Sequence, residues 1–219
     1  MRQPGSYSHL VFDLDDTLYP RQAGLMQEIG RRITLWVERE FEFSPDQARA
    51  LRNRYLTRYG TTLAGLIAEH NVDIDGYLAF VHDIPVSEFV QPSPDLNSML
   101  EGISLRRSVF TNATAEHAWR VLRALGAEGM FEPVIGIREV GLFSKPHPEA
   151  YRRLLELLDT AAESCILVDD RVANLQPAKE MGMTTVLVDG HAEDGVDYAI
   201  SSVLEVGELV RRLAGGGRD

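Results

Sequence analysis

The sequence predicts an α/β protein with a doubly wound, Rossmann-like parallel sheet as its core and an inserted helical cap domain. Two observations support this prediction. From residue 91 onward, short apolar segments alternate with helical patterns, which is typical of parallel strands joined by right-handed crossovers. Residues 21–90, in contrast, show only helical periodicity. We therefore expect a catalytic core made of residues 1–20 and 91–219, and a cap made of residues 21–90.

The expected elements begin with a buried strand at residues 9–12 and four helices in the cap. The second of these helices begins at Ser44-Pro45, a cap followed by a proline in the first turn, and ends at Gly60. The proline-rich residues 91–94 mark the return to the core. Further strands are expected at 107–110, 133–136, 165–168 and 184–187, and further helices at 96–100, 116–125, 148–158, 175–181 and 203–213. Gly215–Gly217 is expected to be a frayed tail.

Composition restricts the classes of function. The formal net charge of −11 argues against binding a nucleic-acid polymer or an anionic membrane surface. A single cysteine, Cys165, excludes a disulfide framework within the chain and is interpreted as a small core residue. We find no pattern typical of a signal peptide or a membrane span. We therefore expect a cytoplasmic protein that is a monomer or a small homo-oligomer.

Polar side chains follow three of the expected strands. Because parallel strands end at one edge of a sheet, we expect these side chains to converge. Near them in the sequence lies Lys145, one of only two lysines among 22 basic residues, and prolines nearby restrict its backbone. This suggests a positioned ammonium group. The converging residues are Asp13 and Asp15, Thr111 and Asn112, and Asp169 and Asp170.

Four carboxylates at one edge would repel each other without a cation, and an all-oxygen ligand set favours Mg²⁺ over Zn²⁺. With Mg²⁺ and Lys145 neutralising an incoming phosphate, one carboxylate can act as a nucleophile. A carboxylate two residues later can protonate the leaving alcohol and then deprotonate water. The hydroxyl of Thr111 and the amide of Asn112 can bind phosphoryl oxygens. These parts together favour an aspartyl-phosphate phosphotransferase.

Four segments resemble the ordered motifs of the haloacid dehalogenase-like hydrolase superfamily: residues 12–18, 110–112, 145–146 and 168–174. The helical insert resembles that superfamily's helical cap of the first type. The resemblance implies a nucleophile at Asp13, a general acid/base at Asp15, a phosphate ligand at Thr111 and a charge neutraliser at Lys145. It also implies a Mg²⁺ ion held by Asp13, the main-chain carbonyl of Asp15 and Asp170, with Asp169 assisting.

Residues 59–66, residues 82–85 and residues 110–113 with His117 are similar to the pyrimidine 5′-nucleotidase subfamily. This similarity implies removal of phosphate from UMP or CMP. In the cap, Arg54 and Arg58, with Tyr55 between them, are candidates for contacting the leaving group of the substrate.

Several residues have a structural alternative to a functional role. Asp16 is interpreted as shaping the turn after the first motif rather than touching substrate. Asn112 either binds phosphate or ties loops together, and Asn174 either orients a metal-bound water or Lys145 from a second shell or makes a helix-start hydrogen bond. For His117 and His147, which open helices, a capping or exposed position is favoured over catalysis.

The favoured function is a Mg²⁺-dependent phosphomonoesterase that acts on a small phosphorylated metabolite through an aspartyl-phosphate, and the subfamily resemblance makes it a pyrimidine 5′-nucleotidase that converts UMP or CMP to nucleoside and phosphate. The alternatives on the same motifs are a phosphatase or phosphomutase for another metabolite, such as a sugar phosphate or pyridoxal phosphate. A haloacid dehalogenase is disfavoured because carbon–halogen hydrolysis uses neither a general acid such as Asp15 nor a Mg²⁺ site. A non-catalytic binding protein is disfavoured because no catalytic position is lost.

Overall fold

A computed structural model describes residues 7–190 and 195–214, so the expected glycine tail lies outside the described residues. The core is a six-stranded sheet with the order β3-β2-β1-β4-β5-β6, and every pair of neighbours is parallel. This confirms the predicted fold class. The strands are β1 (His9–Phe12), β2 (Arg106–Phe110), β3 (Val134–Ile135), β4 (Cys165–Asp169), β5 (Thr184–Val188) and β6 (Tyr198–Ile200).

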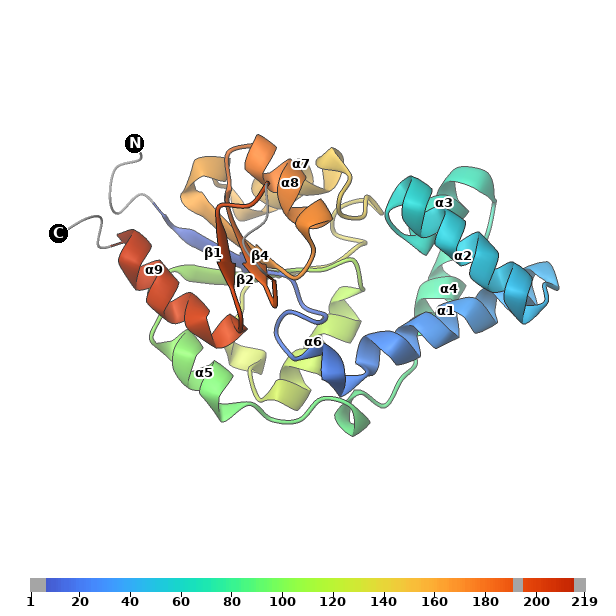
Figure 1. The fold of residues 1–219 in the computed structure, drawn as a ribbon, viewed down its shortest axis with the longest axis horizontal. Coiled ribbons are helices and arrows are strands. Elements are labelled where there is room, and N and C mark those ends of the chain that lie inside the picture. Colours follow the sequence, from blue (N-terminus) through green and yellow to red (C-terminus); the bar gives the residue numbers. More distant parts are fainter. Residues whose placement is uncertain (1–6, 191–194, 215–219) are drawn as a thin grey trace.

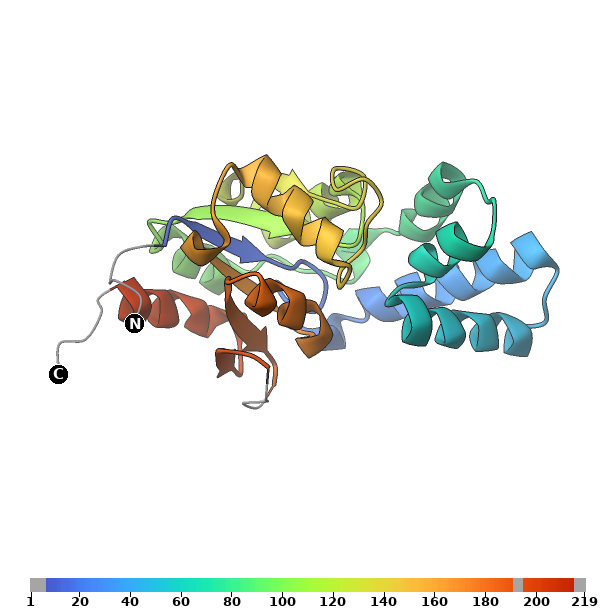
Figure 2. The same ribbon diagram turned by 90° about the horizontal axis from the view of Figure 1, so that it is seen from above.

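Helices cover both faces of the sheet (Figures 1 and 2). Because side chains of a strand alternate between its faces, Leu10 and Phe12 of β1 belong to one hydrophobic cluster and Val11 to another. The first cluster is completed by α5 (Pro94–Glu101), α6 (Ala115–Leu125) and α9 (Val206–Ala214). The second is completed by α7 (Pro148–Leu158) and α8 (Val172–Glu180). β1 is therefore buried on both faces and flanked by β2 and β4.

The predicted elements are confirmed with small shifts in their bounds, apart from β6, which the sequence analysis missed. The strand that ends in Asp169 includes this residue, and α8 begins at Val172 rather than at residue 175. Cys165 is buried in the sheet, as predicted. Within the described part of the chain, no helix combines the length and apolarity that crossing a membrane requires.

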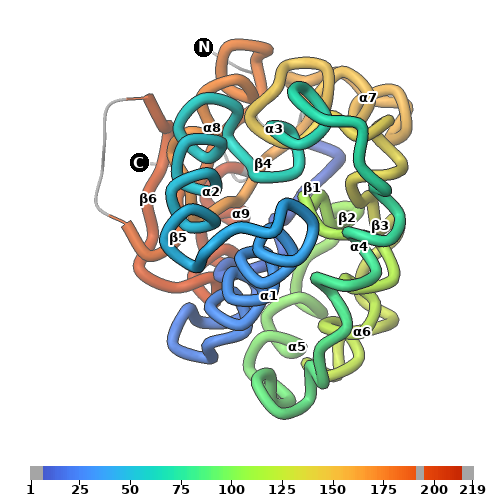
Figure 3. The backbone as a smooth tube through the Cα atoms, turned by 90° about the vertical axis from the view of Figure 1, so that its right-hand side faces the viewer, coloured from blue at the N-terminus to red at the C-terminus, as the bar shows by residue number. Residues whose placement is uncertain are grey.

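Four helices between β1 and β2 form the cap: α1 (Leu25–Phe41), α2 (Pro45–Tyr59), α3 (Thr62–Glu69) and α4 (Ile74–His82). They project from one end of the sheet (Figure 1), and Figure 3 shows them in front of the strands from that end. The cap has its own hydrophobic cluster, which includes Trp36, Tyr55 and Leu66. The domain boundaries near residues 20 and 90 stay a prediction.

Helix α2 begins and ends as its sequence predicts. The Ser44 side chain accepts a hydrogen bond from the Gln47 amide, and the Gln47 side chain accepts one from the Ser44 amide. At the other end, Gly60 adopts a left-handed conformation with φ of 82°. The two caps therefore fix where helix α2 begins and where it ends.

Candidate active site

Three carboxylates meet at the edge of the sheet where the parallel strands end. Asp13 follows β1, Asp169 is the last residue of β4, and Asp170 follows it. One carboxylate oxygen of each residue lies within 4.8 Å of the others. Asp13 is held in place by Thr17, whose hydroxyl donates to Asp13 Oδ2 over 3.2 Å. The predicted convergence of residues that are about 150 positions apart is therefore present in the structure.

Lys145 joins these carboxylates. Its ammonium group donates to Asp13 Oδ1 over 2.7 Å, to Asp169 Oδ2 over 2.8 Å and to the Phe110 carbonyl over 2.8 Å. All three donors of the ammonium group are thereby used. The side chain is only 1% exposed, and burial alone would lower its pKa, but Asp13 and Asp169 raise the pKa to about 12. Lys145 is therefore a buried, charged group at the centre of the site.

Asn112 fixes the main chain of Lys145. Its Oδ1 accepts a hydrogen bond from the Lys145 amide over 2.7 Å, and its Nδ2 donates to the Lys145 carbonyl over 3.0 Å. These contacts are those of a residue that ties two loops together, which was one of its two predicted roles. The phosphate-binding roles of Asn112 and Thr111 stay predictions; Thr111 is buried and its hydroxyl accepts the Ala113 amide.

The Asn174 side chain donates hydrogen bonds to the Asp169 carboxylate. Its Nδ2 lies 2.9 Å and 3.0 Å from the two carboxylate oxygens of Asp169, and the Arg171 amide donates to Asp169 Oδ1 over 2.9 Å. Asn174 therefore orients the carboxylate that in turn binds Lys145, rather than touching Lys145 directly. Such second contacts fix the geometry of the group that faces the ligand.

The side chain of Asp15 turns away from the three carboxylates. Its Oδ1 accepts a hydrogen bond from the Tyr19 hydroxyl over 2.6 Å and lies 3.6 Å from His117 Nε2. Burial alone would raise the pKa of Asp15, but His117 and Tyr19 outweigh it and the pKa falls below its ordinary value. Any contact of Asp15 with a metal would have to come from its main-chain carbonyl, and that role stays a prediction.

His117 corrects a sequence-based interpretation. We expected a capping or exposed position, but its side chain is fully buried and the Thr114 hydroxyl caps α6 instead. The ring of His117 lies 4.7 Å from that of His82, whose pKa is lowered to about 3 by burial and by His117. For His147 the capping position is confirmed, because its side chain accepts a hydrogen bond from the Glu149 amide.

Arg21 connects two acids beside the site. It lies 3.3 Å from Asp16 Oδ2 and donates to Asp170 Oδ2 over 2.8 Å. Asp16 adopts a left-handed conformation with φ of 60°, which agrees with its predicted role in shaping the turn. Burial and the nearby Asp170 raise the pKa of Asp16 to about 6.

The residues at this edge fit a hard cation. All candidate donors are carboxylate oxygens, the type of ligand that Mg²⁺ prefers. Burial raises the pKa of Asp13 well above its ordinary value, although Lys145 opposes this change, and burial also raises the pKa of Asp170. Lys145 and Arg21 together bring two positive charges to three carboxylates, so they do not neutralise the cluster. A divalent cation held by Asp13 and Asp170, with Asp169 nearby, would supply the missing positive charge.

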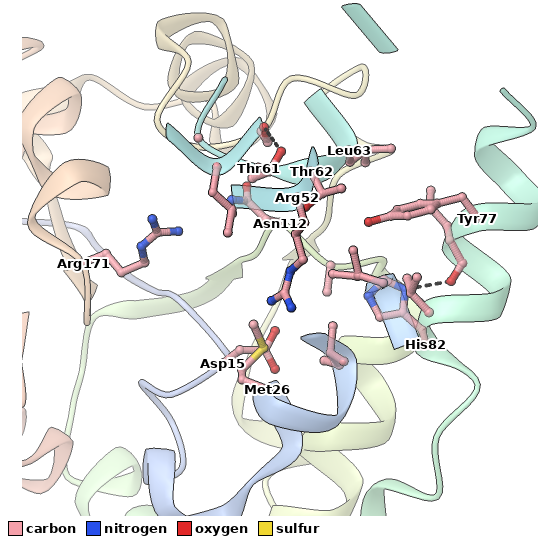
Figure 4. Close-up of a pocket in the computed structure, with 18 residues that line it drawn as sticks. Asp15, Met26, Arg52, Thr61, Thr62, Leu63, Tyr77, His82, Asn112 and Arg171 are labelled. Carbon is pink, nitrogen blue, oxygen red and sulfur yellow. Dashed lines mark hydrogen bonds between the residues drawn. The ribbon is translucent and has the colours of Figure 1, made fainter. Parts of the chain in front are cut away.

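A cavity between the cap and the core lies beside Asp15 (Figure 4). The core contributes Asp15, Asn112 and Arg171 to its lining, and the cap contributes Arg52 and His82. Most of the remaining wall is apolar and comes from α1, α3 and α4, including Met26, Ile29, Leu63, Leu78 and Val81. The cavity is therefore enclosed by the cap on one side and by the carboxylate-bearing edge of the core on the other.

The two cap arginines predicted from the sequence lie away from this cavity, and their contact with the leaving group stays a prediction. Arg54 Nη2 lies 2.6 Å from Glu69 Oε2, and Arg58 Nη1 lies 3.5 Å from Glu69 Oε1; neither lines the cavity beside Asp15. Arg52 does. Residues two apart on a helix point about 200° apart, so Arg54 faces away from the site that Arg52 faces.

The sequence contains a signal that could have identified Arg52. It lies four residues after Ala48 and three before Tyr55, and both of these residues are buried in the cap. Positions with this spacing share one face of a helix. An arginine on the buried face of α2 is therefore a better candidate for an internal site than arginines on its exposed face.

Comparison with known proteins gives a family and a fold. The model of the haloacid dehalogenase-like hydrolase family matches residues 7–182. The glyceraldehyde 3-phosphate phosphatase of Methanocaldococcus jannaschii is 28% identical over 93% of this chain and 97% of its own length. Phosphate metabolism protein 8 of Saccharomyces cerevisiae is 26% identical over 80% of this chain and 60% of its own. The crystal structure of a HAD phosphatase from Thermococcus onnurineus is 19% identical, covers 93% of this chain and 97% of its own, and has a TM-score of 0.64, which shows a common fold.

Proposed function

The chain belongs to the haloacid dehalogenase-like hydrolase family and is a phosphoric monoester hydrolase, and from this premise we propose that it is Mg²⁺-dependent and works through an aspartyl-phosphate on Asp13. The observation that carries the proposal is the buried ammonium of Lys145 between Asp13 and Asp169, beside a third carboxylate. This arrangement keeps a carboxylate at a strand end, with two further carboxylates close enough to share a cation with it.

In the proposed first step, an oxygen of Asp13 attacks phosphorus and the bond from phosphorus to the leaving oxygen breaks. Asp15, which takes up a proton when the negatively charged phosphate binds beside it and raises its pKa, gives this proton to that oxygen, so an alcohol leaves. In the second step, Asp15 takes a proton from water, which attacks phosphorus and releases inorganic phosphate and the Asp13 carboxylate. Lys145 donates a hydrogen bond to Asp13 and so favours the ionised carboxylate and orients it for the attack. A bound Mg²⁺ would neutralise phosphoryl charge at the carboxylate edge.

The environment of Asp15 supports its role as a base in the second step. Tyr19 and His117 keep the pKa of Asp15 below its ordinary value, so its carboxylate is ionised in the free protein. A general base must be ionised before it accepts a proton. The same contacts hold the side chain away from the cluster of Asp13, Asp169 and Asp170, so that nucleophile and base are separate groups.

Two substrate classes are proposed within this reaction class: pyrimidine nucleoside monophosphates and triose phosphates. The resemblance of residues 59–66 and 82–85 to pyrimidine 5′-nucleotidases favours UMP or CMP. A relative that matches along nearly its whole length and is named glyceraldehyde 3-phosphate phosphatase favours a triose phosphate. The largely apolar wall of the cavity suits the uncharged carbon skeleton of either leaving group.

The first experiment compares wild type with Asp13→Asn on UMP, CMP, AMP, glyceraldehyde 3-phosphate, glucose 6-phosphate and pyridoxal phosphate. We expect phosphate release by the wild type and a loss of more than about 1,000-fold in kcat for Asp13→Asn, because the nucleophile is removed. Asp46→Asn on the exposed start of α2 is the matched control. Substantial turnover by folded Asp13→Asn would refute the nucleophile, and a preference for AMP or glucose 6-phosphate would refute both substrates.

A further inference from the structure

Arg52 lacks the acidic partner that most arginines of residues 21–90 have, and Arg39, which also lacks one, lies over the ring of Phe80 instead. Within residues 7–190 and 195–214, no carboxylate lies within ion-pair distance of the Arg52 guanidinium, although six other arginines of residues 21–90 have such partners. Five of those six are exposed, whereas Arg52, like Arg32, is partly buried. The six are Arg21, Arg31, Arg32, Arg49, Arg54 and Arg58.

The contacts of Arg52 leave part of its guanidinium unsatisfied. Nη1 donates to the Gly30 carbonyl over 2.8 Å and lies 3.4 Å from the Thr34 hydroxyl, while the buried Nε has no hydrogen-bond partner. Burial lowers the pKa of Arg52. A partly desolvated cation with a free donor is costly unless an acceptor approaches it.

The guanidinium points into the cavity. Figure 4 shows the Arg52 side chain descending from the cap among the lining residues, with its head toward Asp15 and Met26. Asp15 marks the place of the leaving oxygen in the proposed reaction. Arg52 therefore faces the far part of the leaving group, beyond the bond that breaks.

Gly30 leaves the space that this guanidinium occupies. A Cβ atom at Gly30 would lie 2.6 Å from Arg52 Nη2 and 3.1 Å from Nη1. Gly30 lies inside α1, where glycine costs about 0.5–1 kcal/mol relative to alanine. Helix α1 thus has an unfavourable helix residue at the point where the guanidinium of Arg52 packs against it.

We propose that Arg52 selects the substrate by binding an oxygen acceptor, either a carbonyl or a carboxylate, on the leaving group. A guanidinium suits this role because its planar, fork-shaped set of donors can bind one or two acceptor oxygens in a fixed orientation. Arg171 lines the same cavity but is exposed, so water satisfies its charge. The inference rests on the proposed function, since the place of the leaving group is set by Asp15.

The experiment measures kcat and KM for wild type, Arg52→Met and Arg52→Lys. The substrates are glyceraldehyde 3-phosphate and UMP, which carry carbonyls, 3-phosphoglycerate, which carries a carboxylate, and phenyl phosphate, which carries neither. A hydrogen bond to a charged group contributes about 1.5–3 kcal/mol, or roughly 10- to 150-fold in affinity. We expect Arg52→Met to raise KM by this factor for the substrate whose acceptor group the wild type prefers. The KM for phenyl phosphate should change less than about twofold.

Arg52→Lys keeps the charge without the fork and should fall between the wild type and Arg52→Met. Gly30→Ala should raise KM for the same substrates by displacing the guanidinium, although it strengthens the helix. Arg49→Gln, an exposed change on the same helix, is the control and should leave KM unchanged. Equal losses on all four substrates, with an unchanged melting temperature, would overturn the role of Arg52.

A binding measurement separates this inference from the proposed reaction. Calorimetry with glyceraldehyde 3-phosphate, UMP and 3-phosphoglycerate is carried out on Asp13→Asn and on Asp13→Asn with Arg52→Met. We expect the second protein to bind its preferred compound at least about 10-fold more weakly. Equal affinities refute the role of Arg52 whatever the nucleophile is. Turnover by Asp13→Asn, in contrast, refutes the proposed function and leaves the affinity difference measurable.

Discussion

At the level of single residues, the site depends on one buried cation. Lys145 satisfies two carboxylates and a carbonyl, while Asn112 fixes its main chain and Asn174 orients one of its carboxylate partners. Removing one partner of a buried ion pair typically costs about 3–5 kcal/mol, because the other charge remains buried and unpaired. The geometry of Asp13 is therefore set before any ligand arrives.

Asp16 should make the free protein less stable at high pH. Its pKa in the folded protein is raised from 3.8 to about 6, so folding is favoured while it is protonated, below pH 4. This contribution is lost as the pH rises through about 6. In EDTA, Asp16→Asn should therefore raise the free energy of unfolding at pH 8 by about 1–2 kcal/mol, after allowance for partial exposure, and change it little at pH 4.

Asparagine is a suitable replacement because it tolerates the left-handed conformation of Asp16, which has φ of 60°. The measurement is urea unfolding at both pH values. Asp16→Ala is the control for backbone strain, since it removes the charge but fits this conformation poorly. An equal change at pH 4 and pH 8 for Asp16→Asn would contradict the pKa argument.

The sequence predicts the positions of side chains at strand ends better than the positions of side chains on the cap. The positions of Asp13, Asp169 and Asp170 follow from strand order alone, since parallel strands end at one edge. The direction of the Arg52 side chain, in contrast, depends on how α2 is rotated about its axis. That rotation is set by packing between helices, which a local sequence pattern does not show.

At the level of elements, the end of β3 and the start of α6 touch through their backbones. A Cβ atom at Gly136 would lie 2.6 Å from the Ala115 nitrogen and 2.7 Å from the Ala113 oxygen. Neither atom can move without shifting the segment that follows Thr111. Gly136→Ala should therefore reduce the free energy of unfolding by about 1–3 kcal/mol and lower kcat.

Gly129→Ala is the matched control, because a Cβ atom at this position would have no neighbour within 4 Å. Its effect on the free energy of unfolding should stay within about 0.5 kcal/mol. Thermal unfolding followed by circular dichroism, with phosphate release measured in parallel, compares the two variants. A Gly136→Ala protein as stable and active as Gly129→Ala would show that the close approach is relaxed at little cost.

β6 shows where prediction of elements fails. This edge strand has only three residues, Tyr198–Ile200, and pairs only with β5. Three residues are too few to show the alternation that identifies a strand. The side chain of Asp197, which accepts hydrogen bonds from the amide and hydroxyl of Thr185, helps to place it beside β5. Such tertiary contacts are not visible in a local pattern.

For the molecule as a whole, the carboxylate edge should couple metal binding to stability. A ligand that binds only the folded state adds RT ln(1 + [L]/Kd), or about 2.7 kcal/mol at 100 times Kd. We expect millimolar Mg²⁺ to raise the melting temperature of the EDTA-treated wild type. Asp170→Asn should lose most of this increase, because it removes a candidate ligand.

Asp46→Asn, which changes an exposed acid on the cap, should keep the full increase and so controls for general salt effects. The test is differential scanning calorimetry with and without Mg²⁺, together with the loss of phosphatase activity in EDTA. The same Mg²⁺-dependent increase in wild type and in Asp170→Asn would place the ion elsewhere.

The arrangement of the sheet has a consequence for synthesis of the chain. β1 lies between β2 and β4, and His9 pairs with Arg106 on one side and Cys165 on the other, which is 156 residues later. An emerging chain cannot complete this pairing until its C-terminal third has left the ribosome, and such long-range pairing slows folding. Until then the apolar segment Leu10–Phe12 lacks its partners, which makes the nascent chain a candidate for chaperone binding.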